Sequence, residues 1–281
     1  MPNKHERSLL EDIFDFVRSF LPNRNDGITK AIGKFLYLAV TVCFILSSVL
    51  LWCYFGSAKH QRDIIDSVRE RRDSSSSVYA FFDDLKADNS DFTAWLKIQG
   101  TNIDNPVYIS NKTDYYKNKN MLKKHSRYGA LYIPKENSKP YCQNTVIYGN
   151  NIQDGSMFGT LKYFRNLKFY KQNPTVSLTV NGKTEKYVIY AVNVVSAKQK
   201  KDYTKSEFQG KNSFISWINK QKQNSIIDTG IDINRGEKIL TLITDTKDFD
   251  GAKLVVSARK LRVKEHYNLD VSKAKVNWHS H

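Results

Sequence analysis

Apolar residues in the C-terminal two thirds of the chain fall into short runs that are typical of β-strands. Each run is rich in β-branched or aromatic residues and is bounded by Gly, Pro, Asn or Asp. Six such runs stand out, at 129–134, 143–149, 175–180, 185–195, 238–244 and 253–259. Many short strands with few helices predict a mostly β fold that closes, or nearly closes, into a β-barrel.

Two shorter patterns refine this expectation. The dipeptide Asn181-Gly182 separates two of the runs and is typical of a tight hairpin turn. The stretch 211–224 has its apolar residues Phe214, Trp217 and Ile218 at helical spacing. One helix is therefore expected between two of the late strands.

A single long apolar stretch lies near the N-terminus. Residues 35–55 are 21 residues without a charge, enough to cross a bilayer core of about 30 Å as a helix. Trp52 and Tyr54 near one end suit a membrane interface. A buried helix of a soluble protein is a weaker alternative. A cleaved signal peptide also fits less well, because the segment starts late and lacks a small-residue cleavage site.

The segments on either side of this predicted transmembrane helix are polar or mixed. Residues 1–34 contain the stretch "SLLEDIFDFVRSFLP", which predicts an amphipathic helix on the membrane surface or against a partner. Residues 56–77 read as a charged linker helix that ends in serines. We place the folded domain at 78–261 and a basic tail at 262–281. Lys and Arg flank the span almost equally, so charge bias leaves its orientation open.

The charge composition favours certain classes of binding partner. With 44 Lys+Arg against 28 Asp+Glu, the net charge of +16 favours polyanions such as nucleic acid, acidic lipid or an anionic cell-wall polymer. The sequence has no Cys/His zinc spacing and no RNA-binding aromatic signature, so composition alone does not choose among these polyanions. We expect no metal site, no cofactor and no nucleic-acid partner. The three cysteines, Cys43, Cys53 and Cys142, indicate no disulfide framework.

One charged residue stands in an unexpected place. The run Ile239–Ile243 is almost continuously apolar, which predicts a strand buried on both faces. Asp245 follows where that strand emerges. A carboxylate at the end of a buried strand needs a partner, and Lys253 opens the next predicted strand.

Three stretches together resemble class B sortases, the membrane-anchored cysteine transpeptidases of Gram-positive bacteria. They are "DFTAWLKIQGTNIDNPV" at 91–107, "VIYGNNIQDGSMFGTLKYF" at 146–164 and "TLITDTKDFDGAKLVVSAR" at 241–259. They occur in the family's order, and the predicted helix at 211–224 lies where class B members insert one. The resemblance implies a sortase-type barrel outside a single-pass anchor at the cell membrane, and a surface protein's sorting-signal peptide as partner.

The resemblance fails at the three catalytic positions. The family's Tyr-Gly-His-Asn is here Tyr148-Gly149-Asn150-Asn151. The family's Thr-Leu-x-Thr-Cys ends in Asp245, and the family's Arg before a Val-Val pair corresponds to Lys253. His, Cys and Arg are thus replaced by Asn, Asp and Lys, either naturally or by deliberate substitution.

These replacements predict the loss of transpeptidase activity. Asn150 has no proton that titrates in the useful range, Asp245 is a poor nucleophile toward an amide, and Lys253 lacks the planar fork of arginine. Two other candidates do not restore the site. Cys142 precedes the strand that ends near Asn150 and so lies at its far end, and His125 reads as a solvated loop residue.

Three hypotheses follow. The first is a sortase-fold module that binds a sorting signal or assists assembly, with groove walls near Tyr148, Thr244 and the helix at 211–224. The second is a class B sortase, anchoring surface proteins to the cell wall or pilin, represented by an inactive version. The third is an intramolecular isopeptide bond, because Lys253, Asn150 and Asp245 supply the three residue types such a bond needs.

Overall fold

The computed structural model describes residues 18, 20–21, 27–112, 114–134, 137 and 142–277. The chain divides into two compact units, 1–68 and 69–281. The amphipathic helix predicted within 1–34 falls almost wholly outside the described residues, as does the end of the tail from 278.

Helix α2 (Ile28–Ser74) is the main described element of the first unit. Its apolar portion is long and apolar enough to cross a membrane, by length and composition, and its large apolar side chains, such as Phe35, Leu50 and Trp52, are exposed. The predicted span and most of the predicted linker are one continuous helix. At about 1.5 Å per residue, the 21 uncharged residues rise roughly 31 Å.

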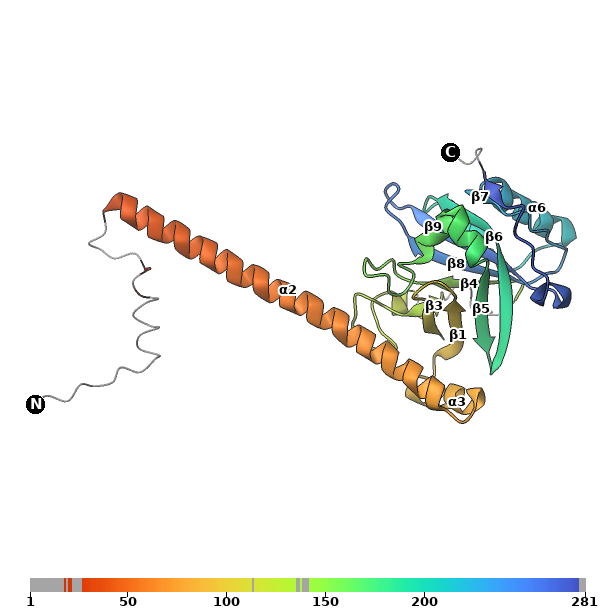
Figure 1. Ribbon diagram of the computed structural model, residues 1–281, viewed down its shortest axis with the longest axis horizontal. Helices are drawn as coiled ribbons and strands as arrows, with labels where there is room; N and C mark the ends of the chain where they lie inside the picture. Colours follow the sequence, from red (N-terminus) through yellow and green to blue (C-terminus); the bar gives the residue numbers. More distant parts are fainter. Residues whose placement is uncertain are drawn as a thin grey trace, which may run out of the picture. The chain divides into compact units, whose positions relative to one another are not determined.

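The second unit is built around a closed β-barrel, as predicted (Figure 1). Its strands run in the order β1-β2-β3-β4-β8-β9-β6-β5, and β5 pairs with β1 to close the circle. The β2–β3 and β4–β8 pairs are parallel and the other pairs are antiparallel. The strands are β1 (Phe92–Ile98), β2 (Asp104–Ile109), β3 (Leu131–Ile133), β4 (Asn144–Tyr148), β5 (Thr175–Val180), β6 (Lys183–Val195), β8 (Ile239–Asp245) and β9 (Lys253–Lys260).

All six runs expected from the apolar pattern are strands, but the pattern did not predict β1 and β2. In β2, Asn105 and Pro106 interrupt the apolar run and are typical of a turn. The barrel tolerates the proline because the parallel pairing with β3 begins only at Val107. Tertiary pairing therefore outweighs the local turn signal.

The predicted hairpin joins β5 to β6. Asn181 and Gly182 have φ of 47° and 74°, and Val180 pairs with Lys183 across them. Two consecutive positive φ angles define the tight turn whose twist matches that of the flanking strands.

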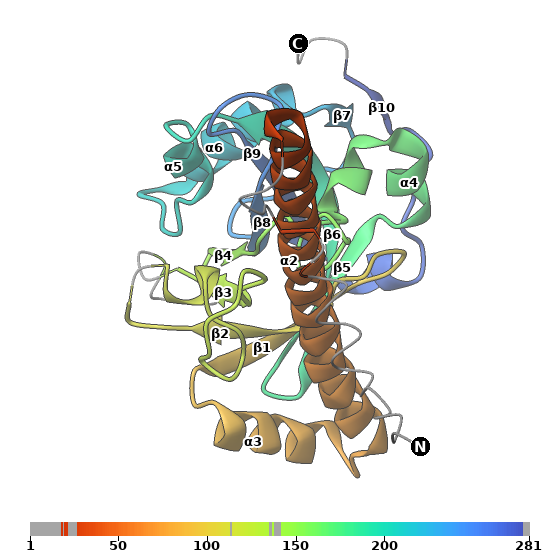
Figure 2. The same ribbon diagram turned by 90° about the vertical axis from the view of Figure 1, so that its left-hand side faces the viewer.

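Short helices surround the barrel. They are α3 (Val78–Asp88), α4 (Leu167–Gln172), α5 (Lys200–Tyr203) and α6 (Lys211–Gln223), with 3₁₀ turns at Tyr115–Lys117 (η1), Leu161–Arg165 (η3) and Val263–His266 (η4). Strand β10 (Lys275–Val276) pairs with β7 (Ile227–Asp228). Figure 2 shows α3 at one end of the barrel and the β7–β10 pair at the other.

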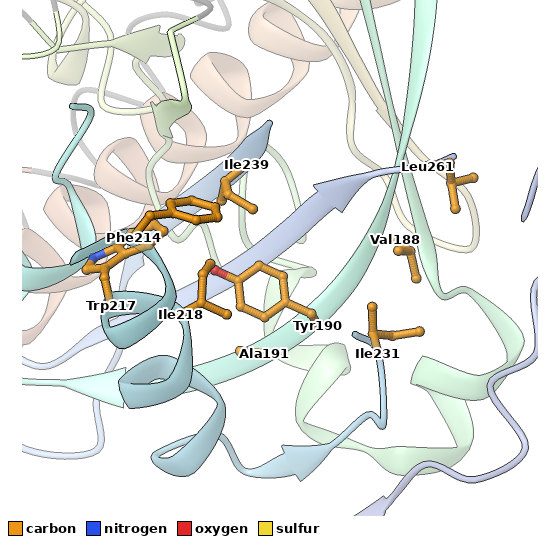
Figure 3. Packing of buried hydrophobic residues seen from close by; sticks show 9 residues of the cluster. All are labelled: Val188, Tyr190, Ala191, Phe214, Trp217, Ile218, Ile231, Ile239 and Leu261. Atoms are coloured by element: carbon orange, nitrogen blue, oxygen red, sulfur yellow. The ribbon is translucent and has the colours of Figure 1, made fainter. Parts of the chain in front are cut away.

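Helix α6 covers part of the outer barrel surface with the predicted apolar stripe. Phe214, Trp217 and Ile218 pack with Tyr190 of β6 and Ile239 of β8 (Figure 3). Phe214 is 1% exposed and Ile239 is 1% exposed, so both faces of this contact are closed to water. The helix therefore buries the beginning of β8 from outside the barrel.

Strand β8 is buried on both faces, as its unbroken apolar run predicts. From Ile239 to Thr244 every residue is buried, and Asp245 is the first exposed residue. Ile243 packs with Val146, Val255 and Tyr203 of α5. Because side chains alternate along a strand, Asp245 lies on the same face as Ile243, just beyond this cover.

Candidate functional site

The ends of β4, β8 and β9 bring the sequence-predicted site residues together. Tyr148 pairs with Ile243, and Asp245 pairs with Lys253. All five predicted residues line one pocket of about 110 Å³. Its lining is Asp114, Lys117, Tyr132, Tyr148, Gly149, Asn150, Lys200, Ile243, Thr244, Asp245 and Lys253. The roles assigned to these residues stay predictions.

The junction between β4 and β8 fixes the floor of this pocket. The Gly149 N–H donates to the Ile243 carbonyl at 3.2 Å, and the Thr244 hydroxyl donates to the Gly149 carbonyl at 2.7 Å. Thr244 is 3% exposed, so its hydroxyl holds the two strand ends together. The Asn151 side-chain amide donates to the Asp245 carbonyl at 2.9 Å and extends the same seam.

Asp245 and Lys253 form an ion pair across the β8–β9 ladder. The Lys253 side chain is 20% exposed, whereas that of Asp245 is 52% exposed. The Asp245 side of this pair is therefore open to water, whereas the Lys253 side is largely covered. Asp245 is exposed because it is the last residue of β8 and lies beyond Ile243, which packs with Tyr203 of α5.

Asn150 is held by a neighbouring loop. Its side-chain amide donates to the carbonyls of Lys117 at 2.8 Å, Arg127 at 3.2 Å and Tyr128 at 3.3 Å. Gly129 makes this approach possible, since a Cβ there would meet the Lys117 carbonyl at 2.6 Å and the Asn150 amide at 2.9 Å. Asn150 thus ties the end of β4 to the loop that contains η1.

These contacts do not favour an isopeptide bond. The Lys253 ammonium contacts the Asp245 carboxylate, and the Asn150 amide is engaged by loop carbonyls. In the described part of the chain, no hydrogen bond or ion pair joins Lys253 to Asn150.

Several wall residues were not found from the sequence. Tyr132 stacks on Tyr148 with ring centroids 5.7 Å apart, and its hydroxyl donates to Asp114 at 3.0 Å. The Lys200 ammonium lies 4.9 Å from the centre of the Tyr148 ring. The predicted strand run 129–134 contains Tyr132 and was the available signal for it, because this strand pairs with β4 through Tyr132 and Tyr148.

Among the described residues, none of helix α6 lines this pocket, and its predicted place in the wall of a peptide groove stays a prediction. Trp217 and Lys220 of α6 instead line a separate hollow with residues 201–202 and 204–207. Lys200 of α5 takes the place at the pocket because α5 packs beside β4 and β8 through Tyr203. The stripe on α6 is used for barrel packing.

A second pocket, of about 220 Å³, lies on the other side of the same strand end. It shares Thr244 and Asp245 with the first pocket. Its other lining residues are Asn151, Gln153, Phe158, Lys162, Arg165, Thr246, Lys247 and Leu254. Arg165 makes a two-pronged contact with Asp248, at 2.6 and 3.2 Å, which lowers the pKa of that carboxyl.

The remaining candidates for chemistry lie elsewhere. Cys142 precedes β4 at the end opposite Asn150, where its thiol contacts the Asn144 carbonyl at 3.5 Å. His125 is exposed in a loop and pairs in a bridge with Lys119. Within the described ranges, neither pocket is lined by a thiol or an imidazole, and no cluster of His, Cys, Asp or Glu is placed to hold a metal.

Comparison with known proteins connects this barrel to one family. A sortase domain model matches residues 96–261. Sortase B of Listeria monocytogenes is 28% identical over 245 residues, which cover 83% of this chain and 98% of that protein. Sortase B of Staphylococcus aureus is 25% identical over 186 residues, covering 65% of this chain and 75% of that protein.

Solved structures agree. A cysteine-to-serine variant of Clostridium perfringens sortase B is 34% identical with a TM-score of 0.63, covering 65% of this chain and 87% of that one. A Staphylococcus aureus sortase B–substrate complex shares the fold, with a TM-score of 0.66 at 20% identity over 73% of this chain and 98% of that one. The chain belongs to the sortase family, in its class B branch.

Proposed function

We propose that this protein is a class B sortase-family member that binds a sorting-signal peptide at the cell surface and does not perform cysteine transpeptidation. One observation carries the proposal. The pocket at the ends of β4, β8 and β9 presents Asp245, Asn150 and Lys253 where the family resemblance implies Cys, His and Arg. The side chains needed for thiolate attack and proton transfer are therefore replaced in the pocket itself.

The contacts of the three residues support inactivity. A transpeptidase of this kind needs a nucleophile, a proton donor for the leaving amine and a cation for the oxyanion. The Asn150 amide is engaged by loop carbonyls, and the Lys253 ammonium faces Asp245. Attack by the Asp245 carboxylate would also produce an anhydride, a far less stable acyl intermediate than a thioester.

The walls of the pocket support retained binding. Tyr148, Tyr132 and Lys200 form a stacked aromatic and cationic wall next to the substituted residues. Fold and binding surface are separable from catalytic chemistry. The related Staphylococcus aureus sortase B has been captured as a substrate complex, which supports a peptide as the ligand of this fold.

Location completes the proposal. Helix α2 would anchor the chain as a single membrane span with the barrel outside the cell, as the family resemblance implies. The net charge of +16 would add attraction to anionic cell-wall polymers. We propose no nucleic-acid partner and no cofactor.

A restored triad tests the proposal. The variant Asn150→His/Asp245→Cys/Lys253→Arg and the unchanged chain are compared as full chains in detergent micelles, with a quenched-fluorophore peptide that contains a Thr-Gly bond. We expect peptide binding by both and thiol-dependent cleavage by the triple variant alone. Single restorations should stay inactive because the three groups act as a unit, whose loss costs about 10⁶ in turnover in a protease example.

Two controls sharpen this comparison. Cys142→Ser in the triple variant should leave cleavage intact, because Cys142 lies at the far end of β4. Cleavage by the unchanged chain that disappears in Asp245→Ala would refute the inactive assignment. A folded unchanged chain that binds no sorting-type peptide would refute the binding role.

A further inference from the structure

The two pockets at the end of β8 form adjoining hollows on either side of Asp245. They share Thr244 and Asp245, so a chain lying in one pocket reaches the other by passing over the Asp245 side chain. That side chain is 52% exposed and is accessible from outside. An extended ligand can therefore contact both pockets.

The lining of the two pockets is strongly cationic. It includes six basic side chains but only two carboxylates, those of Asp114 and Asp245. Lys253 is paired with Asp245, and Arg165 is paired with Asp248, which lies outside the lining. Asp114 accepts a hydrogen bond from the Tyr132 hydroxyl.

Four lysines remain, two in each pocket. Lys117 and Lys200 line the first pocket, and Lys162 and Lys247 line the second. Within the described part of the chain, none of the four forms an ion pair with a carboxylate, and Lys200 lies over the Tyr148 ring. Each side of Asp245 thus offers two ammonium groups that protein carboxylates do not neutralise.

We infer that the ligand is a peptide with acidic side chains on both sides of a neutral segment that passes over Asp245. This inference rests on the proposed peptide-binding function and specifies its ligand. Complementary charges in clefts favour association of oppositely charged ligands. A uniformly anionic polymer fits less well, because it would place a negative group against the half-exposed Asp245 carboxylate.

Two synthetic peptides test the charge requirement. Both have a central Thr-Gly segment, flanked on each side by two Glu in one peptide and by two Gln in the other. Binding to the full chain in uncharged detergent micelles is measured by fluorescence anisotropy. We expect the Glu peptide to bind about tenfold more tightly at low salt, from several weak exposed ion pairs acting together. In 0.5 M NaCl the difference should fall to about twofold because salt screens exposed charges.

Lysine variants locate the effect. Lys117→Gln/Lys200→Gln and Lys162→Gln/Lys247→Gln should each weaken binding of the Glu peptide more than binding of the Gln peptide, and so remove part of the preference. The control Lys183→Gln/Lys264→Gln removes the same charge from exposed lysines outside both pockets and should retain the full preference.

The possible failures are distinguishable. If the Gln peptide bound as tightly as the Glu peptide, the acidic requirement would be wrong and the peptide-binding function would stand. If neither peptide bound, the proposed function itself would fail. If polyphosphate bound more tightly than the Glu peptide and displaced it, the pockets would be a polymer site and the peptide inference would be overturned.

Discussion

Asp245 ends strand β8, and its carboxylate meets the Lys253 ammonium at a position half open to solvent. Removing one partner of a buried pair costs about 3–5 kcal/mol, whereas exposed pairs contribute about 0.2–1 kcal/mol. The 52% exposure of Asp245 places this pair near the second range. The two residues therefore matter more for the charge of the pocket than for the stability of the barrel.

A double-mutant cycle checks this placement. We expect Asp245→Ala and Lys253→Ala each to lower the free energy of unfolding by about 1 kcal/mol or less, with a coupling energy of about 0.2–1 kcal/mol. Urea denaturation followed by tryptophan fluorescence measures both quantities. The exposed Arg71–Asp88 pair provides a comparison cycle. A coupling energy above about 3 kcal/mol would show that the Asp245–Lys253 pair behaves as a buried ion pair.

Intact mass provides a separate check at the same residues. A Lys253–Asn150 isopeptide bond would release ammonia and lower the mass by about 17 Da, as expected for condensation of an amine with a carboxamide. Since the contacts keep Lys253 on Asp245 and Asn150 on the loop, we expect the unmodified mass. A homogeneous loss of ammonia would contradict this geometry.

At the element scale, the loop containing η1 is joined to the end of β4 through Asn150 and Gly129. Gly129 has a φ of +62°, and an added Cβ would meet two loop carbonyls at 2.6 Å. We expect Gly129→Ala to destabilise the barrel by about 1–3 kcal/mol more than a positive-φ glycine in open space. Gly236→Ala is that control, because Gly236 has a φ of +84° and no atom within 4 Å of its added Cβ.

Thermal and urea unfolding of the two glycine variants measure the difference. Gly129→Ala should also weaken peptide binding, since Lys117 lies in the same loop and lines the first pocket. Equal stability losses in the two variants would mean that only the shared backbone strain counts, and that the contact with Asn150 is unimportant.

The segment after β9 is joined to the barrel by an ion-pair network. Arg259 is fully buried, and its two terminal nitrogens each donate to Glu265 at 2.7 Å. Arg262 bonds to Glu237 at 2.6 and 3.1 Å. The boundary predicted at 261 stays a prediction, but η4 and β10 lie beyond it, so the stretch predicted as a basic tail contains ordered elements.

This network predicts a pH-dependent stability. The hydrogen bonds from Arg259 lower the pKa of Glu265 below its ordinary value of 4.5. A lowered folded-state pKa contributes stability above the ordinary pKa, and this stability is lost as the pH falls through the folded-state value. We expect Glu265→Gln to cost about 3 kcal/mol at pH 7, the low end for a buried pair because Glu265 is partly exposed.

The difference between the unchanged chain and Glu265→Gln should shrink as the pH falls below about 4.5, because protonation then removes the same carboxylate charge. Urea unfolding from pH 7 to pH 3 measures it. Glu70→Gln, at an exposed carboxylate, should change stability little at any pH. A difference that stays constant with pH would exclude the Arg259–Glu265 pair as its source.

At the scale of the whole molecule, the prediction concerns topology. The uncharged part of α2 is a candidate span by length and composition, and the basic residues on its two sides are nearly balanced. We expect the barrel outside the cell, as the family resemblance implies. Protease added to intact cells should then remove the barrel while a cytoplasmic marker survives. Full protection of the barrel, with digestion after lysis, would reverse the orientation.

The sequence by itself determined the fold class, most of the strands, the β5–β6 hairpin and the α6 stripe. It could do so because alternation, turn chemistry and helical spacing are local properties. It also singled out Asn150, Asp245 and Lys253, because the motifs around them are contiguous.

Only the tertiary structure decided what surrounds those residues. The exposure of Asp245 depends on its place beyond Ile243, which packs with Tyr203 of α5. The Asn150 contacts come from a loop more than 20 residues earlier. The four lysines that flank Asp245 lie in segments far apart in sequence and share one site only because the barrel closes. The order of charges along the chain does not show which lysines lie close together in space, because the pairing of strands distant in sequence decides this.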